Sequence, residues 1–360
     1  MMSATLSRYI AGRTLRGIAL AFLIVTAIIT LVDFVENSRN IGADIDISLL
    51  NLLSLTLLKV PKLIEQTIPF VVLFGVMGAL YGMNRRSELI VMRASGLSAW
   101  TFLRPAVMVS AVLGVLWATI CNPISSNMIG HYDARSAAIT GNASADEIWL
   151  REGSETAQRV IHANFLNDKR FTDATFYELE LEQDGATRFV RRYDAAKAEL
   201  LTPGYWTLTG VIENAPGEET KRTETITLPT SINPEEIREQ TGQQIDPPFW
   251  KIRSEIEANE KAGFSARALH LQLNKLLALP FLLVAMTFIA AGVSMSLTRQ
   301  GGTLRLLVTG AAVGFAVFFA DSVMSAFGEV AILPVILAAW AVPALVLLLS
   351  VSYLAKIEDG

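Results

Sequence analysis

Long apolar runs separated by short polar segments dominate this chain, and one polar region interrupts them near the middle. A bilayer core about 30 Å thick requires roughly 20 mostly apolar residues in a helix. Six runs reach that length, at residues 17–37, 49–82, 103–122, 269–297, 303–327 and 331–354. The pattern predicts an α-helical integral membrane protein with three transmembrane helices before the polar region and three after it.

The second apolar run is longer than a simple membrane span and has charged residues and a proline in its first half. These residues are Lys59, Pro61, Lys62 and Glu65. We interpret this half as an amphipathic, proline-kinked entry to a helix that continues into the membrane. The first run follows a basic segment, as in a secretory signal, but no small-residue cleavage pattern follows it in VDFVENSRN. We therefore expect the first run to be retained as a helix.

In the polar region, apolar and polar residues alternate with a period of two from Val160 to Leu228. In ATFYELELEQ, threonine, tyrosine and leucine side chains share one face, while Phe176 and glutamates share the other. This alternation is typical of a half-buried strand. Similar segments are RVIHANFLN, RFVRRYDAAKAELL, GYWTLTGVIEN and RTETITLPT. Short strands at this spacing favour an antiparallel sandwich or open roll.

The period changes in PPFWKIRSEIEANEKAG, where Trp250, Ile252 and Ile256 lie toward one side and Gly263 can serve as a C-terminal cap. This segment predicts a helix that leads back to the membrane. The predicted organisation is then three transmembrane helices in residues 1–122, a β domain in 123–245, a connecting helix in 246–268 and three more transmembrane helices in 269–360.

Basic residues in the short loops predict the orientation of the chain in the membrane. They are Arg8, Arg13 and Arg16 at the N-terminus, Arg85, Arg86, Arg93 and Arg104 after the second run, Arg299 and Arg305 after the fourth, and Lys356 at the end. With six spans, this bias places both termini in the cytoplasm and the inserted domain on the opposite side of the membrane. Residues 128–268 hold 24 of the 34 acidic and 16 of the 30 basic residues. This negative balance argues against a nucleic acid partner.

Recognised catalytic motifs are missing from the sequence. It contains neither the G-x-x-x-x-G-K-[ST] loop that binds nucleotide phosphates nor a G-x-S-x-G nucleophile elbow. The chain is therefore not expected to be an enzyme or to hydrolyse ATP itself. His131, His162 and His270 are scattered and no paired cysteines occur, so we predict no metal site and no cofactor.

Charged residues in or beside the membrane runs are candidate functional residues. Asp321 lies well inside the fifth run, where a carboxylate is costly. Asp321 either lines a substrate cavity or gate as a polar residue, or makes a structural hydrogen bond between helices. Toward the outer side lie the bases Arg39, Lys59, Lys62 and Lys275. They can pair with the phosphates of an anionic lipid, or they can snorkel or pair locally, for example Lys62 with Glu65.

The segment NRRSELIVMRASG, between the second and third runs, is too charged to span a bilayer and too apolar for a solvent loop. Ser87 can cap a short helix that begins at Glu88, and Gly96 can close it. Side chains that come together at three- and four-residue spacing are Leu89, Met92 and Arg93. A short helix parallel to the membrane either transmits force from a cytoplasmic motor or simply lies on the lipid.

Four segments are distinctive in combination: RSELIVMRASG, FVENSRN after the first run, the pair Pro61 and Pro69, and LPVILAAWAVPAL near the end. Together they resemble the lipopolysaccharide export permeases, and the LptG-type subunit more closely than its LptF-type paralogue. The resemblance covers essentially the whole chain. It implies six transmembrane helices with a periplasmic β-jellyroll, in an ABC transporter where two such permeases pair with a dimer of a separate ATPase. Such a complex extracts lipopolysaccharide from the inner membrane and passes it, on its way to the outer membrane, to periplasmic bridge proteins with β-jellyroll domains.

The resemblance also implies roles for single residues. The loop helix, residues 84–96, is the coupling helix in that family, and an acid at the place of Glu88 meets the ATPase. The expected ATPase-coupling set is Arg86, Glu88, Leu89, Met92 and Arg93, and the expected lipid-binding set is Phe34, Glu36, Arg39, Lys62 and Lys275. Some members carry a lysine where this chain has Asp33. Because Asp33 cannot bind a phosphate as a cation does, that contact is either lost in this chain or moved to Arg39.

Other functions stay open from the residues alone. The chain could be the LptF-type paralogue, or a membrane-anchored sensor that binds a ligand with its periplasmic β domain. A membrane enzyme acting on lipid could use Asp33, Glu36 or Asp321, although no nucleophile, base or metal partner stands near them in the sequence. A sensor also lacks a recognisable signalling module after the last run.

Overall fold

The computed structural model describes residues 4–40, 48–140, 147–153, 157–167, 170–181, 187–202, 204–217, 219–230, 232, 247–261, 265–297 and 303–359. The chain forms two compact units, which we describe separately. The first comprises Met1–Ile129, Pro247–Arg253 and Arg267–Gly360, and the second comprises Gly130–Asp246 and Ser254–Ala266.

The helices confirm the predicted arrangement of three membrane spans before the β domain and three after it, because six described helices are long and apolar enough to cross a bilayer. They are α1 (Ala4–Asn40), α2 (Leu49–Arg85), a third formed by α4 (Ala99–Leu116), the π-helical turn η1 (Trp117–Cys121) and α5 (Asn122–Thr140), then α8 (Arg267–Leu297), α9 (Thr303–Glu329) and α10 (Val335–Asp359). The third helix thus continues well past residue 122, where the apolar run ends. Pro61 and Pro69 both lie inside α2, which is one helix from Leu49 to Arg85.

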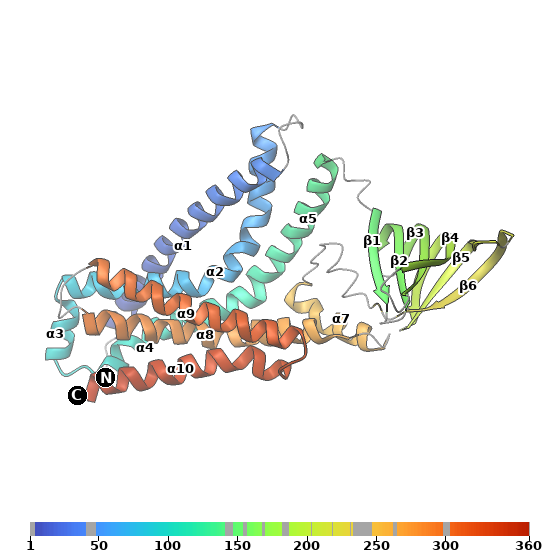
Figure 1. Ribbon diagram of the computed structural model, residues 1–360. Coiled ribbons are helices and arrows are strands. Elements are labelled where there is room, and N and C mark those ends of the chain that lie inside the picture. The colour runs from blue at the N-terminus through green and yellow to red at the C-terminus, as the bar shows by residue number, and fades with distance from the viewer. Residues whose placement is uncertain are drawn as a thin grey trace. The chain divides into compact units, whose positions relative to one another are not determined.

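The helices α2 and α8 are the most buried of the six long helices. Val71 and Val72 on α2 and Leu283 on α8 are fully buried. In Figure 1, α8 lies between α9 and α10, and it also packs against α2 and α4. In contrast, α1 and α9 are mostly exposed along their length and carry large apolar side chains such as Leu23 and Phe319. A helix with an apolar exposed face requires lipid or another protein around it.

Glycines allow α1 and α2 to approach closely. A Cβ added at Gly75 would lie 2.4 Å from the Cα of Ile18, and one added at Gly17 would lie 2.3 Å from the carbonyl oxygen of Gly75. Side chains cannot fit at such distances, so the two backbones are in direct contact. Small residues serve the same purpose at helix interfaces in other membrane proteins, since close backbones gain van der Waals contact.

A short helix, α3 (Glu88–Ala94), connects α2 and α4. Figure 1 shows it at the same end of the first unit as the beginning of α1 and the end of α10. Both termini of the chain therefore lie on the side of the predicted coupling helix.

The second unit contains a six-stranded antiparallel sheet in which the strands pair in sequence order. They are β1 (Glu147–Gly153), β2 (Ala157–Asn167), β3 (Arg170–Leu181), β4 (Thr187–Thr202), β5 (Tyr205–Asn214) and β6 (Lys221–Pro229). Five of them confirm the segments predicted from the alternating pattern, and β1 precedes that pattern. An antiparallel β domain is confirmed, and its described strands form one sequential sheet rather than two stacked sheets.

One face of this sheet carries the core of the domain. Trp206 is fully buried, and its ring lies 5.2 Å from that of Phe171 and 5.9 Å from that of Phe176, centre to centre. Phe176 belongs to the face of β3 that also carries glutamates, so this polar-looking face is the one that points inward. The threonine and tyrosine on the other face, Thr175 and Tyr177, are only half-buried.

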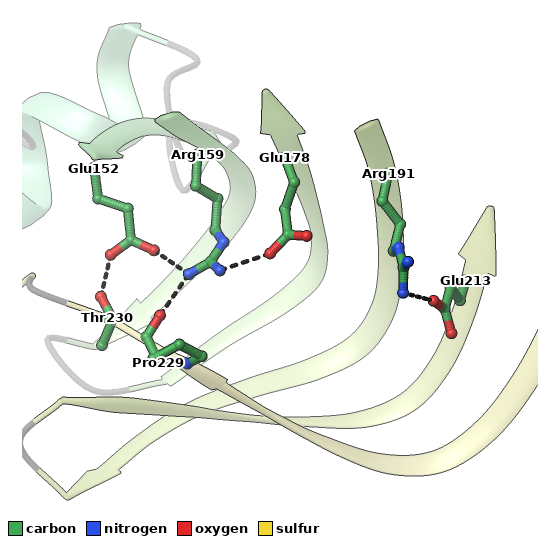
Figure 2. Close-up of polar contacts among 7 residues, drawn as sticks. All are labelled: Glu152, Arg159, Glu178, Arg191, Glu213, Pro229 and Thr230. Carbon is green, nitrogen blue, oxygen red and sulfur yellow. Dashed lines mark hydrogen bonds and ion pairs between the residues drawn. The ribbon is translucent and has the colours of Figure 1, made fainter. Parts of the chain in front are cut away.

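An inward-facing charged row explains why glutamates share the buried face (Figure 2). The guanidinium of Arg159 on β2 donates to Glu152 on β1 at 2.6 Å and to Glu178 on β3 at 2.7 Å. Farther along the sheet, Arg191 pairs with Glu213. Only 14% of the Arg159 side chain is exposed. Burial acts to lower the pKa of Arg159, but its bonds with Glu178 and Glu152 outweigh burial, so the pKa is raised.

The same row of charged residues connects β1 to the end of β6. Arg159 also donates to the carbonyl oxygen of Pro229 at 2.6 Å, and the hydroxyl of Thr230 donates to Glu152. Because β1 and β6 are the two edges of the sheet, these bonds curl it into a roll that is fastened at one end. We call Glu152, Arg159, Glu178, Pro229 and Thr230 the clasp.

The predicted helix that leads back to the membrane is confirmed as α7 (Phe249–Lys261). Ile252 and Ile256 are buried, as the pattern indicates. The expectation that Trp250 lies on the same side is wrong: its side chain is 69% exposed. Its indole N–H instead donates to the carbonyl oxygen of Thr119 at 2.9 Å. Gly263, the predicted cap, lies outside the described residues.

Candidate functional site

The backbone, rather than a side chain, defines the start of α3. Ser87 has φ 61° and ψ 10°, and its hydroxyl makes no capping bond, so the predicted side-chain cap is wrong. In this left-handed conformation the carbonyl of Ser87 accepts the N–H of Val91 at 3.0 Å. At the other end, Gly96 has φ 82° and donates its N–H to Arg93, as predicted for the residue that closes the helix.

The apolar residues of α3 lie on two sides. Leu89 and Met92 are buried in the core of the first unit, at 5% and 8% exposure. Ile90 and Val91 are 61% and 65% exposed. Leu89 and Met92, the apolar residues expected to meet the ATPase, anchor the helix, and the exposed pair Ile90 and Val91 is available to a partner. The sequence carries a sign of this arrangement: apolar residues on opposite sides of a short helix indicate that one side packs inward while the other meets a partner.

Glu88, the acid of the predicted coupling set, interacts with α1. Its Oε2 accepts the hydroxyl of Tyr9 at 2.9 Å, and its Oε1 lies 3.7 Å from Nη2 of Arg13. Arg13 also donates from Nε to the Tyr9 hydroxyl at 3.1 Å. The Glu88 side chain is 27% exposed, so it is accessible from outside while it holds α3 to α1.

The two arginines of the predicted coupling set differ in their surroundings. Arg86 is exposed where α2 ends. Arg93 donates from Nη2 to Oε2 of Glu358, near the end of α10, at 3.2 Å. Neither Tyr9 nor Glu358 was singled out from the sequence, because their partners are 79 and 265 residues away.

The predicted lipid-binding residues of the first helix lie near its end. Glu36 and Arg39 are exposed and Phe34 is half-buried. The side chain of Asp33 is 3% exposed, and its Oδ1 lies 2.8 Å from the ammonium of Lys59 on α2. Asn37 donates to Asp33 at 2.8 Å and to Thr56 at 3.3 Å. Asp33 is thus neutralised within the protein.

Lys62, also on α2, makes the local pair that the sequence permits, with 3.9 Å between its Nζ and Oε1 of Glu65. Glu65 in turn accepts bonds from Asn122 and Ser125 on α5, each at 3.0 Å. The oxygen of the Asn122 side chain accepts the first N–H of α7, that of Phe249, at 2.9 Å. The acid therefore organises a junction of three helices, and Lys62 lies at its border with 20% of its side chain exposed.

Lys275, a predicted lipid-binding residue, and Asp321, the predicted polar residue inside the membrane, lie together. Their Nζ and Oδ2 atoms are 3.0 Å apart across α8 and α9. Lys275 also donates to the hydroxyl of Ser325 at 2.7 Å, and Ser325 donates to the carbonyl oxygen of Asp321 at 2.7 Å. Within the membrane a paired charge costs far less than an isolated one, so this contact favours the structural interpretation of Asp321.

Among the residues that the structure describes, no group of histidine, cysteine and acidic side chains could hold a metal ion. The polar side chains of the first unit instead form links between helices. The first unit is therefore a helical membrane unit in which α3 exposes one apolar side. Ion pairs from Glu88 and Arg93 hold α3 to α1 and α10.

Comparison with known proteins gives the family. The chain matches the lipopolysaccharide export system permease LptF/LptG family over residues 8–356. It is also 27% identical over 179 residues to the lipopolysaccharide export system permease protein LptG of Haemophilus influenzae. That match spans 48% of this chain and 47% of the relative, about half of its length. Because the family match extends over nearly all of the six helices and the β domain, the chain belongs to the LptF/LptG family of lipopolysaccharide export system permeases.

Proposed function

We propose that this chain is an inner-membrane permease subunit of an ABC transporter that extracts lipopolysaccharide and passes it to a periplasmic bridge. The family match and the six membrane-spanning helices support a permease. The similarity to a relative named LptG supports the LptG type, with an LptF-type chain as its partner in the membrane.

The observation that carries the proposal is the exposed apolar surface of α3. Ile90 and Val91 are exposed, while Leu89 and Met92 on the same short helix are buried and hold it to the bundle. The chain lacks a phosphate-binding loop of its own. A rigidly anchored helix with exposed apolar side chains fits the groove of a cytoplasmic ATPase, because a partner gains by burying that surface. The Glu88 side chain adds a charge beside it.

The exposed faces of α1 and α9 are proposed to meet lipid and the sister permease. Large apolar residues are exposed along both helices, among them Leu20, Leu23, Ile28, Phe315 and Phe319. Two such permeases facing one another would enclose an apolar space for acyl chains. At the outer border of that space, Arg39 and Lys62 supply positive charge for the lipid phosphates.

The orientation follows from the distribution of basic residues in the loops. Both termini and α3 lie on the cytoplasmic side in this proposal, and the β domain lies in the periplasm. The roll fastened by the clasp is then the part that meets the β domains of the bridge proteins.

The experiment is reconstitution of the chain with an LptF-type permease and the ATPase of the same organism in lipid vesicles that contain lipopolysaccharide. The wild-type complex is expected to release lipopolysaccharide to added bridge protein only when ATP is present. Ile90→Asp with Val91→Asp should abolish both ATPase association and release. A matched control is Ile332→Asp, because Ile332 is as exposed as Val91, at 65%, but lies in the turn between α9 and α10. Release by the Ile90 and Val91 double variant at the wild-type rate would contradict the proposal.

A further inference from the structure

Glu358 makes two contacts at the corner between α3 and α4. Its Oε1 accepts the backbone N–H of Ala99, the first residue of α4, at 2.8 Å. Its Oε2 accepts from Nη2 of Arg93 on α3 at 3.2 Å. Only 18% of the Glu358 side chain is exposed, compared with 41% for Arg93. The preceding turn of α10 is anchored by Leu354, which is fully buried.

The position of this acid is unfavourable for its own helix. Glu358 lies in the last turn of α10, where the helix dipole favours a base rather than an acid. The same carboxylate is favourable for α4, because the first N–H groups of a helix have no partner inside it and the dipole is positive there. Glu358 therefore stabilises the start of α4 and the end of α3. A local conflict of this kind is expected at functional positions.

Glu358 also connects α3 and the start of α4 to α10, which belongs to the last three membrane helices. The backbone connects α3 to α2 and α4, and Glu88 connects it to Tyr9 on α1, so these links stay within the first three membrane helices. In contrast, α10 packs chiefly against α8 and α9. Of the polar contacts described above for α3 and the start of α4, those with Glu358 connect to the last three membrane helices.

We propose that Glu358 is a positioning residue for energy coupling. It holds the corner between α3 and α4 against the end of α10, so that a displacement of α3 by the ATPase passes directly to α10 and then to α8 and α9. This inference rests on the proposed function of α3 as the helix that meets the ATPase. It adds a second route of transmission, in addition to the backbone of α2 and α4.

The test uses the reconstituted complex and measures lipopolysaccharide released per ATP hydrolysed. Glu358→Ala removes both contacts, whereas Glu358→Gln keeps an oxygen that can accept the Ala99 N–H and removes the charge that pairs with Arg93. We expect the ratio to fall by about fivefold or more in Glu358→Ala, as for a typical coupling between sites, and to fall less in Glu358→Gln. ATP hydrolysis and assembly should stay near wild type. Lys356→Ala, at an exposed base in the same turn, is the control and should leave the ratio unchanged.

Arg93→Ala, alone and combined with Glu358→Ala, identifies the path. If the two residues act through their contact, the double variant should be no worse than Glu358→Ala. An unchanged ratio in Glu358→Ala, with a wild-type complex that is active, would overturn the inference and leave the proposed function intact. A parallel loss of assembly, hydrolysis and release would also overturn it, because Glu358 would then serve only to stabilise the fold. Failure of the wild-type complex to release lipid would instead reject the proposed function itself.

Discussion

Lys59 on α2 lies 2.8 Å from the buried carboxylate of Asp33 on α1. Asn37 donates to the other oxygen of the same carboxylate at 2.8 Å. Asp33 is therefore the centre of an interhelical contact. The positive charge beside it, that of Lys59, comes from the neighbouring helix.

This contact predicts an asymmetric effect of removing either charge. Lys59→Met leaves Asp33 buried without its cation and should cost about 3 kcal/mol of stability. Asp33→Asn should cost less, because Lys59 is 26% exposed and can turn toward water or lipid headgroups. The double variant should recover most of the loss. Thermal unfolding of the purified chain in detergent measures all three, and equal losses from both single changes would contradict the buried pair.

The pair of Lys275 and Asp321 gives a second prediction, which separates the two interpretations of Asp321. Lys275→Met alone leaves Asp321, whose side chain is 20% exposed, without its cation and should lower the unfolding temperature. Adding Asp321→Leu should restore it, and the double variant should keep lipopolysaccharide release in the reconstituted complex. A stable double variant that has lost release would favour the substrate cavity or gate instead.

The close contact of α1 and α2 predicts opposite effects of one substitution at two glycines. Gly75→Ala should destabilise the chain by about 1–3 kcal/mol, because the new methyl group would meet the backbone of Ile18. Gly78→Ala on the same helix is the control, since a Cβ there meets nothing within 4 Å. It should stabilise α2 by up to about 1 kcal/mol through helix propensity. Chemical unfolding followed by tryptophan fluorescence compares the two, and similar effects would contradict the close backbone contact.

The clasp predicts how the edges of the β domain are held. Arg159→Met leaves Glu152 and Glu178 without their shared cation and should cost about 3 kcal/mol locally. Arg170→Met breaks an ion pair whose side chains are 60% and 35% exposed and should cost under about 1 kcal/mol. Hydrogen exchange of the full chain should show faster exchange in β1 and β6 for Arg159→Met only. Unchanged exchange in those strands would show that the clasp does not fasten the roll.

The elements of this fold could be predicted because each rests on a local pattern. Apolar runs long enough to span a bilayer gave the helices, and a period of two gave five strands. The face of β3 that points inward could not be read from its own residues, since Glu178 lies on that face only because Arg159 on another strand neutralises it. The left-handed conformation of Ser87 also has no signature in a serine, so its capping role was predicted wrongly.

The candidate site was predictable only in part for a similar reason. The position of α3 follows from a loop that is both charged and apolar. The residues that bind its charged side chains could not be predicted, because the packing of α1 and α10 brings Tyr9 to Glu88 and Glu358 to Arg93. Likewise, Leu89 and Ile90 look alike in the sequence, and only the packed structure distinguishes the buried residue from the exposed one.

In the proposed function, α3 is the surface on which a separate ATPase acts. A photo-crosslinking amino acid can be placed at Ile90 or, in a second variant, at Val91 in the assembled complex in native membranes, with the same substitution at Ile332 as the control. Ile90 and Val91 are expected to crosslink to the ATPase, and Ile332 is not. A complex that exports lipopolysaccharide normally and gives no ATPase crosslink at Ile90 or Val91 would contradict the proposed function.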